Sequence, residues 1–289
     1  MKKGMWIPIG IVVLVAIGIG VIIRAVAPQV PPPPLPAVTP QVPLPPLPAG
    51  RIVVGGSSSV YVVAVHLAER FMDKHPGVVV ETHSVGSTAG IVGAREGTFH
   101  IGMASRWLRR DEPGWGLREF VICHDAIAPI VHPNNPVRGL TMKQLKKIFT
   151  GEITNWNKVG GENLPITVII REAGSGTRDA FEEIVHEGID PVPTLILVGT
   201  GGVRAGVAGD PSSISYVASP AVDPTVRALE IDGVKPDAAA VVAGDWAIAR
   251  PFLFLTMGEL SPLEQGFIDF VLGSEGQQMV ADEGLVRVD

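Results

Sequence analysis

A glycine- and hydroxyl-rich turn at residues 171–178 has the composition of an anion-binding loop. It reads REAGSGTR, after an apolar run (166–170) typical of a buried strand and before a segment (179–185) with helical spacing. Such a turn presents backbone N–H groups at the positive end of a helix dipole, and an arginine beside it can grip an oxyanion with two parallel hydrogen bonds. The alternative is an ordinary capped loop, with Thr177 as its N-cap and Arg171 on the surface.

Two further strand–turn–helix junctions, at residues 56–59 and 86–88, also combine glycine with hydroxyl side chains. In open α/β sheets, ligands bind beyond the carboxyl ends of the strands, so three such junctions could line one site. A tetrahedral oxyanion needs many donors, and helix N-termini with short hydroxyl side chains supply them without bulk. The candidate residues at the three junctions are Ser57, Ser58, Ser59, Ser87, Thr88, Arg171, Ser175, Gly176 and Thr177, and Ser105 is a further candidate after the third strand.

The elements around these turns predict an α/β fold. After residue 50, short apolar runs alternate with amphipathic stretches in β-α-β-α-β order, which predicts a mostly parallel sheet covered by helices on both faces. Strands are expected at 120–124 and 126–131. Capping-box spacing at Thr141 starts one later helix, and the same spacing at Ser261 starts another, predicted to run through about Asp282.

Composition excludes several classes of function. The chain has 289 residues, of which 46% are hydrophobic and 6% aromatic, and its net charge is −6. It has no long basic run after residue 50, which argues against binding to nucleic acid. The single cysteine, Cys123, lies in an apolar run and is expected to be a buried strand thiol. The seven histidines lack metal-ligand spacing, so we predict no metal and no cofactor.

Residues 1–27 are typical of a membrane anchor. Met5 to Ile23 carries no charge and would span ~28 Å as a helix, and Lys2 and Lys3 favour a cytoplasmic N-terminus. A cleaved signal peptide is the alternative, because Ala25-Val26-Ala27 has the small-x-small pattern of a cleavage site.

Residues 28–50 form a proline-rich linker, with eleven prolines between 28 and 49. This composition predicts an extended polyproline stalk that reaches on the order of 65 Å. The alternative is a proline-rich ligand for another domain.

Motifs throughout residues 51–289 resemble those of a known family, the phosphate-binding subunit of phosphate ABC transporters, which is a receptor of the periplasmic-binding-protein type. The runs that carry the resemblance are GSSSVY (56–61), IGMASR (101–106), HDAIAPIVHPNNPV (124–137), FTGEITNWNKVGG (149–161) and REAGSGTRD (171–179).

The resemblance implies two α/β lobes, joined by hinge strands, that close on one dehydrated phosphate. Lobe I would comprise 51–127 with 250–289, and lobe II 128–249. Arg171 and the Ser175, Gly176, Thr177 turn match the family's anion loop, and Ser87 matches the serine of its second turn. Residues 57–59 correspond to the first loop, but their spacing does not say which serine contacts the ligand.

The chain departs from the best-known members of the family after its third strand. Those members have an aspartate after Ala-Ser that accepts the proton of monohydrogen phosphate, whereas here Ser105 is followed by Arg106, as in a second branch of the family. Distinguishing phosphate from sulfate still requires an acceptor for a P–OH proton. Asp125 is the candidate acceptor, and its alternative role is a structural cap or a partner for Arg106.

The expected function is that of an extracytoplasmic receptor, tethered by its N-terminus or secreted if cleaved, that hands phosphate to an ABC permease in the membrane. The resemblance favours a monomer. A receptor for sulfate, molybdate or tungstate and a non-transporting sensor are alternatives. A phosphatase with Ser175 or Ser87 as nucleophile is disfavoured, because the sequence has no Gly-x-Ser-x-Gly elbow, metal cluster or P-loop lysine. We therefore predict no catalytic residues.

Overall fold

The structure is a computed structural model that describes residues 47–289. The predicted membrane span and most of the proline-rich linker lie outside the described residues. Within residues 47–289, no helix is long and apolar enough to cross a bilayer.

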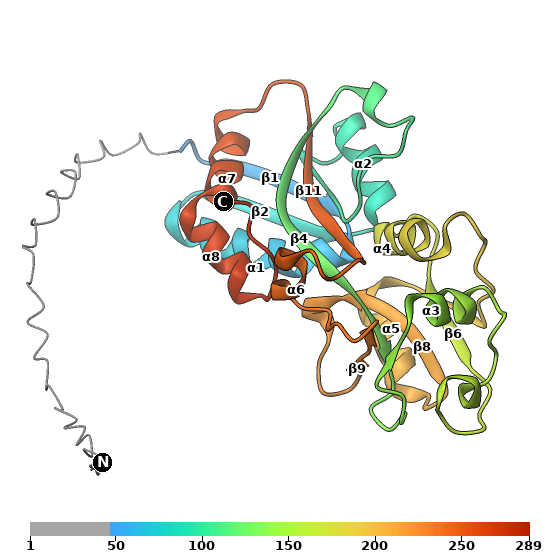
Figure 1. Ribbon diagram of the computed structural model, residues 1–289. Coiled ribbons are helices and arrows are strands. Elements are labelled where there is room, and N and C mark those ends of the chain that lie inside the picture. Colours follow the sequence, from blue (N-terminus) through green and yellow to red (C-terminus); the bar gives the residue numbers. More distant parts are fainter. Residues whose placement is uncertain (1–46) are drawn as a thin grey trace, which may run out of the picture. The chain divides into compact units, whose positions relative to one another are not determined.

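Strands and helices alternate along most of the chain (Figure 1). The strands are β1 (Gly50–Gly56), β2 (Val78–Ser84), β3 (Ile101–Ala104), β4 (Leu117–Val131), β5 (Gly139–Leu140), β6 (Thr167–Arg171), β7 (Leu195–Leu197), β8 (Ser213–Ala218), β9 (Arg227–Ala228), β10 (Glu230–Ile231) and β11 (Ala249–Met257). The helices are α1 (Ser58–Lys74), α2 (Ser87–Glu96), α3 (Met142–Phe149), α4 (Gly176–Phe181), α5 (Gly199–Gly209), α6 (Ala238–Ala243), α7 (Pro262–Leu272) and α8 (Ser274–Asp282).

The main sheet has the strand order β2-β1-β3-β11-β4-β8-β6-β7. Pairing is parallel among β2, β1 and β3 and again among β8, β6 and β7, whereas β11 and β4 run antiparallel to their neighbours. We call the part built on β2, β1, β3 and β11 lobe I, and the part built on β8, β6 and β7 lobe II.

Strand β4 belongs to both lobes. Its first part, as far as Ala126, pairs with β11, and its second part, from Ile127 to Val131, pairs with β8. The strands predicted at 120–124 and 126–131 are therefore one continuous strand that passes from lobe I to lobe II (Figure 1). The mixed α/β fold with two lobes agrees with the prediction.

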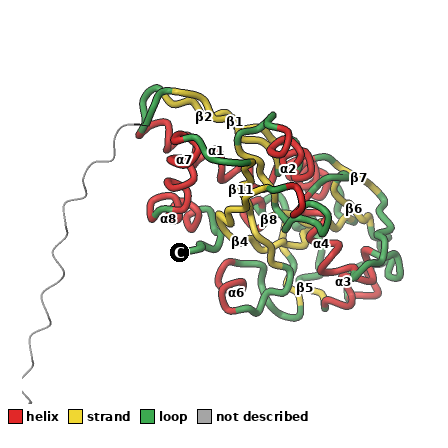
Figure 2. Tube along the Cα trace, turned by 90° about the horizontal axis from the view of Figure 1, so that it is seen from above, coloured by secondary structure: helices red, strands yellow, loops and turns green. Residues whose placement is uncertain are grey.

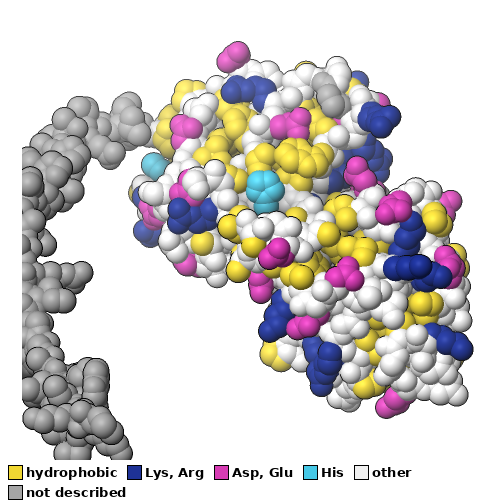
Figure 3. Space-filling view, in the orientation of Figure 1, with side chains coloured by type: hydrophobic (Ala, Val, Ile, Leu, Met, Phe, Trp, Pro, Cys, Tyr) yellow, Lys and Arg dark blue, Asp and Glu magenta, His cyan; other side chains and the backbone are white. Residues whose placement is uncertain are grey.

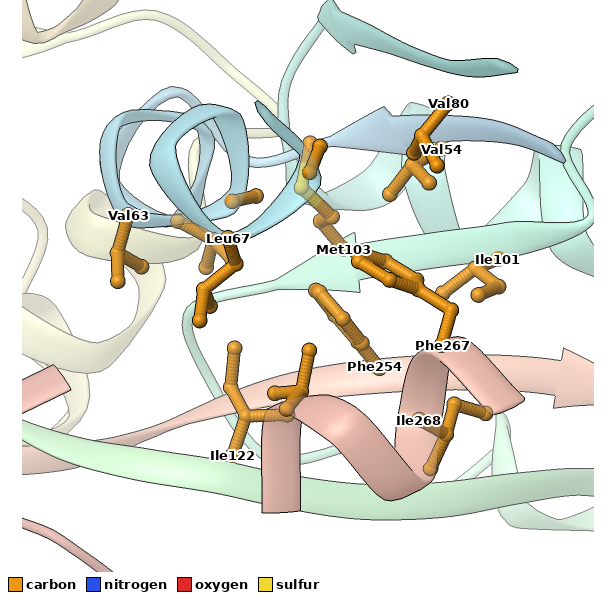
Figure 4. Packing of buried hydrophobic residues seen from close by; sticks show 14 of the residues in the cluster. Val54, Val63, Leu67, Val80, Ile101, Met103, Ile122, Phe254, Phe267 and Ile268 are labelled. Atoms are coloured by element: carbon orange, nitrogen blue, oxygen red, sulfur yellow. The ribbon is translucent and has the colours of Figure 1, made fainter. Parts of the chain in front are cut away.

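The lobe I sheet is covered on both faces, and successive side chains of its strands enter the cores on opposite faces. On β11, Phe252 and Phe254 join the core under α1, α7 and α8, whereas Leu253 and Leu255 join a smaller core under α2. Figure 4 shows residues of the larger core, and Figure 2 shows α7 and α8 lying near α1. Successive side chains of a strand point to opposite faces, so a strand covered on both faces requires a continuous run of apolar residues.

Lobe II follows the same rule. On β6, Val168 and Ile170 pack into the core that contains α3 and α4, whereas Ile169 packs against Val203 and Val207 of α5. Burial on both faces places β6 inside the sheet, and its parallel pairing with β7 and β8 brings the turn after Arg171 to the carboxyl ends of these strands.

Two predicted helices are interrupted. The helix expected from Ser261 to about Asp282 is wrong as one element, because it ends at Leu272 and a second helix begins at Ser274 after the extended Gly273. The helix after residue 175 changes to a π-helical turn at Glu182–His186. The capping boxes at Thr141 and Ser261 both form as predicted.

Candidate functional site

Hydroxyl side chains from both lobes meet at the carboxyl ends of the parallel strands. The N-termini of α1 and α2 come from lobe I, and those of α4 and α5 come from lobe II. Each helix begins where a parallel strand has ended, which is the place where open α/β sheets bind ligands. The buried hydroxyl residues at this meeting point are Ser57, Ser59, Ser87, Ser105, Ser175, Thr177 and Thr200.

The lobe I serines bond to one another and to backbone. Ser57 is the N-cap of α1, where its Oγ accepts hydrogen bonds from the backbone N–H groups of Ser59 and Val60 and donates to Ser105 Oγ at 2.9 Å. Ser87 Oγ accepts from the backbone N–H of Ser105 at 3.1 Å. Ser57 is therefore committed to capping, which leaves Ser58 and Ser59 as the serines of this turn that face lobe II.

Arg171 lies at the end of β6 and is 1% exposed, so the alternative that put it on the surface is wrong. Its Nε and Nη2 donate to the Glu172 carboxylate, each at 2.8 Å, which fixes the plane of the guanidinium. Nη2 also donates to Ser58 Oγ at 3.1 Å, and Nη1 lies 3.5 Å from Thr200 Oγ1. A fixed, buried guanidinium that points at hydroxyl groups is suited to planar recognition of an oxyanion.

Glu172 stays ionised beside this arginine. Burial alone would raise the pKa of its carboxyl, but hydrogen bonds from Arg171 and from the backbone N–H of Gly199 outweigh burial and lower that pKa. The carboxylate is therefore a fixed anchor for Arg171 rather than a proton donor.

The turn at 174–177 carries the N-terminus of α4. Ser175 is the N-cap, because its Oγ accepts from the backbone N–H of Arg178 at 3.3 Å, so the alternative with Thr177 as cap is wrong. Thr177 Oγ1 instead contacts Ser59 Oγ at 2.9 Å. Gly176 approaches lobe I so closely that a Cβ there would lie 2.3 Å from Ser87 Oγ and 2.8 Å from Ser105 Oγ.

Direct contacts hold the lobes together at the site, in addition to the bond from Arg171 to Ser58. Ser59 Oγ meets Thr177 Oγ1, Ser58 Oγ meets Thr200 Oγ1 at 3.1 Å, and the backbone N–H of Thr88 donates to the Gly174 carbonyl at 3.1 Å. The lobes are thus closed on each other at the predicted anion-binding residues. Because acidic and basic side chains are interspersed over the visible face (Figure 3) and the net charge is −6, attraction for an anion must come from these local donors.

Sequence reasoning missed Thr200. It lies in the first turn of α5 and contacts Ser58, Ser59 and Arg171, which are all at the site. Its segment, Gly199-Thr200-Gly201-Gly202, is a fourth glycine–hydroxyl junction after a strand, so the signal used for the other three would have found it.

Arg106 binds mainly charged groups, although its Nη2 also lies 3.4 Å from Thr88 Oγ1. It donates to both oxygens of Glu112, at 2.7 and 2.9 Å, and its Nε lies 2.9 Å from Asp179 of lobe II. Arg109 also donates to Asp179, at 2.7 Å. Arg106, Arg109 and Asp179 line a pocket of about 380 Å³, together with Trp107. Arg106 and Arg109 of lobe I thus form ion pairs with Asp179 of lobe II across the lobe interface.

Asp125 has partners other than those expected. Its Oδ2 accepts from Nε and Nη2 of Arg250 at 2.9 and 2.8 Å, and its Oδ1 accepts from the backbone and hydroxyl of Ser219. The alternative that paired Asp125 with Arg106 is wrong. Burial raises the pKa of Asp125, and Arg250 and Ser219 oppose that shift.

His186 packs behind the anion-binding turn, in the π-helical turn that follows α4. It is 1% exposed among the rings of Phe149 and Phe181, and neither of its ring nitrogens has a hydrogen-bond partner within residues 47–289. Burial, with smaller contributions from Lys146 and Arg178, lowers the pKa of His186 to about 4. The imidazole is therefore neutral in the folded protein at neutral pH.

We expect His186 to destabilise the protein in acid. The unfolded chain takes up a proton on this side chain near pH 6.5, whereas the folded protein does so only near pH 4, so stability falls as the pH drops through this window. The loss should approach roughly 3 kcal/mol. Denaturant unfolding at pH 7 and pH 4 tests this by comparing the wild type with His186→Leu. An equal pH dependence in both would contradict it.

Comparison with known proteins agrees with this architecture. A family described as "PBP superfamily domain" matches residues 44–275. The phosphate-binding protein PstS of Bacillus subtilis is 31% identical over 244 residues, which covers 83% of this chain and 81% of the relative. The phosphate-binding protein PstS of Borreliella burgdorferi is 26% identical, with 82% and 90% covered.

Two solved structures are similar over nearly their whole length. A phosphate ABC transporter substrate-binding protein from Clostridium perfringens, with bound phosphate, is 43% identical, covers 83% of this chain and 100% of that chain, and has a TM-score of 0.81. An ABC-type phosphate transport receptor from Vibrio cholerae is 32% identical, with 81% and 99% covered and a TM-score of 0.69.

Proposed function

We propose that this chain, which belongs to the PstS-like phosphate-binding proteins of the PBP superfamily, is a receptor that binds one inorganic phosphate ion between its lobes. The observation that carries the proposal is the buried cluster in which Arg171 meets the hydroxyl groups of Ser58 and Thr200 across the lobe interface. Four helix N-termini surround this cluster, so positive potential comes from dipoles as well as from the arginine.

Phosphate would take the place of the direct contacts between the lobes. The hydroxyls of Ser58 and Ser59 would then donate to the ion in place of Thr200 and Thr177, which would themselves turn to it. Each hydrogen bond to a charged group contributes about 1.5–3 kcal/mol, so several together can offset the loss of the ion's hydration. The proposed contacts are Ser58, Ser59, Ser87, Thr88, Arg171, Ser175, Gly176, Thr177 and Thr200.

Three of the sequence-predicted residues are proposed to position the site rather than to touch the ion. Ser57 caps α1 and holds Ser105, and Asp125 bonds to Arg250 and Ser219 and to no other side chain within residues 47–289. The acceptor for the P–OH proton would then be a hydroxyl oxygen, because serine and threonine can accept as well as donate. Thr177, whose hydroxyl contacts that of Ser59 in the closed protein, is the proposed acceptor.

A binding role fits these residues better than a catalytic one. Within residues 47–289, neither Ser87 nor Ser175 has a hydrogen bond to a histidine or carboxylate that could activate it as a nucleophile. We therefore propose that the protein is not an enzyme and needs no cofactor.

Delivery to a permease is the second part of the proposal. The relatives named as a transporter's substrate-binding protein and as a transport receptor support an extracytoplasmic receptor that works with an ABC permease. We propose a monomer whose lobes are 51–127 with 250–289 and 128–249, tethered through the proline-rich linker by residues 1–27 or released if these are cleaved.

Loss of the protein should lower uptake of radiolabelled phosphate at low external concentration. Uptake that is unchanged, or restored equally by the wild type and Arg171→Ala, would contradict delivery.

We expect Asp179→Asn to speed phosphate release. The substitution keeps an acceptor for Arg106 and Arg109 but removes the charge that binds them across the lobes, so the closed state loses a partly buried ion pair. The dissociation rate should rise on the order of fivefold. Stopped-flow displacement measures it. Glu275→Gln is the matched control, because Glu275 pairs with Arg70 and Lys74 within lobe I. Equal rates for the two variants would contradict the role of Asp179.

A further inference from the structure

An ion pair is buried where β4 passes from lobe I to lobe II. Asp125 of β4 and Arg250 of β11 are cross-strand partners, and their side chains are at most 1% exposed. Asp125 lies one residue before Ala126, the last position at which β4 pairs with β11. The pair therefore lies at the crossing between the lobes, where a small change in strand geometry changes the angle between them.

Each member of the pair also holds a group from one lobe. Nη1 of Arg250 donates to the backbone carbonyl of Ser105, at the end of β3 in lobe I, over 3.3 Å. The free oxygen of Asp125 accepts from the backbone N–H and the hydroxyl of Ser219, which follows β8 in lobe II, at 3.0 and 3.1 Å. One network thus joins the ends of β3, β4, β8 and β11.

The carbonyl that accepts from Arg250 belongs to Ser105, which bonds to the other lobe I serines of the site. Ser105 Oγ accepts from Ser57 Oγ, its backbone N–H donates to Ser87 Oγ, and a Cβ on Gly176 would lie 2.8 Å from its Oγ. A displacement of Ser105 would therefore move the lobe I serines relative to the N-terminus of α4.

Stability alone does not explain a buried ion pair in this place. Desolvating two charges is costly, and apolar residues of similar volume stabilise a core as well or better. An ion pair adds a fixed relative orientation of its two side chains, because the guanidinium fork and the carboxylate each bond in fixed geometry.

We propose that Asp125 and Arg250 are positioning residues that set the closed angle of the lobes and hold Ser105 in register, so that phosphate affinity depends on them although neither touches the ion. This inference rests on the proposed function. Phosphate affinity would then depend on a hydrogen-bond network whose members do not contact the ion.

The test uses variants that separate affinity from stability. Arg250→Lys keeps the buried charge but has no fork with which to hold Asp125 and the Ser105 carbonyl together. The double variant Asp125→Leu/Arg250→Met removes both charges and fills the space with apolar atoms. We expect each to bind phosphate at least tenfold more weakly than the wild type by calorimetry, with a smaller phosphate-induced rise in Tm.

The control is Val280→Ala, which lowers stability from α8 in the lobe I core. This variant should lower Tm but leave the phosphate Kd unchanged. Substitutions of Asp125 and Arg250 would do the same if their ion pair served stability alone. Wild-type Kd in Arg250→Lys, or in a folded double variant, would overturn the inference. If the double variant does not fold, Arg250→Lys decides. Failure of the wild type to bind phosphate would instead refute the proposed function.

Discussion

Replacing Arg171 with alanine should weaken phosphate binding by at least tenfold and on the order of 100-fold. The guanidinium is buried, fixed by Glu172 and aimed at Ser58 and Thr200, so it is placed to give an oxyanion two charged hydrogen bonds. Its loss also leaves the Glu172 carboxylate uncompensated beside the ion, which adds repulsion. Calorimetric titration of wild type and variant with phosphate measures the difference.

Arg204→Ala is the matched control for this substitution. Arg204 lies on α5, is partly exposed and bonds to Asp223 and the Ala221 carbonyl, so its removal changes the net charge by the same amount without removing a hydrogen bond to the hydroxyl cluster. We expect less than a twofold change in its phosphate Kd. An Arg171→Ala variant that binds as tightly as Arg204→Ala would remove Arg171 from the site.

A single methyl group at Gly176 should have a comparable effect for a steric reason. A Cβ there would lie 2.3 Å from Ser87 Oγ and 2.8 Å from Ser105 Oγ, both in the opposite lobe. Because Gly176 begins α4 without a positive φ, alanine suits its backbone and should not destabilise the open protein. We expect at least a tenfold loss of phosphate affinity without a fall in the Tm of the phosphate-free protein.

Gly209→Ala controls for the change of glycine to alanine in a helix. Gly209 lies in the last turn of α5, and a Cβ there would meet nothing within 4 Å. Calorimetry and thermal unfolding of both variants separate closure from folding. A Gly176→Ala variant with wild-type affinity would show that the lobes do not close as tightly on the ligand as they do here.

Much of the site could be predicted because its signals are local. A glycine–hydroxyl turn between an apolar strand and an amphipathic helix fixes where backbone N–H groups point, and the turns at 56–59, 86–88 and 174–177 all lie at the lobe interface. The continuous apolar run at 166–170 likewise predicted a buried strand, and β6 is covered on both faces.

The parts that sequence reasoning missed depend on partners far apart in the chain. Asp125 meets Arg250 only because β4 and β11 pair in one register, and Arg106 reaches Asp179 only once the lobes close. No spacing in the sequence encodes either contact. The break at Gly273 was also missed, since the apolar spacing continues on both sides of it.

We expect one phosphate ion to bind between the lobes, with a hydroxyl oxygen of the site accepting its proton. Calorimetric titration of the intact protein with phosphate, sulfate and molybdate, at pH 6 and pH 8, tests it most directly. We predict one phosphate per chain, bound at least tenfold more tightly than sulfate or molybdate at both pH values. Equal affinity for phosphate and sulfate, or no binding of phosphate, would contradict this expectation.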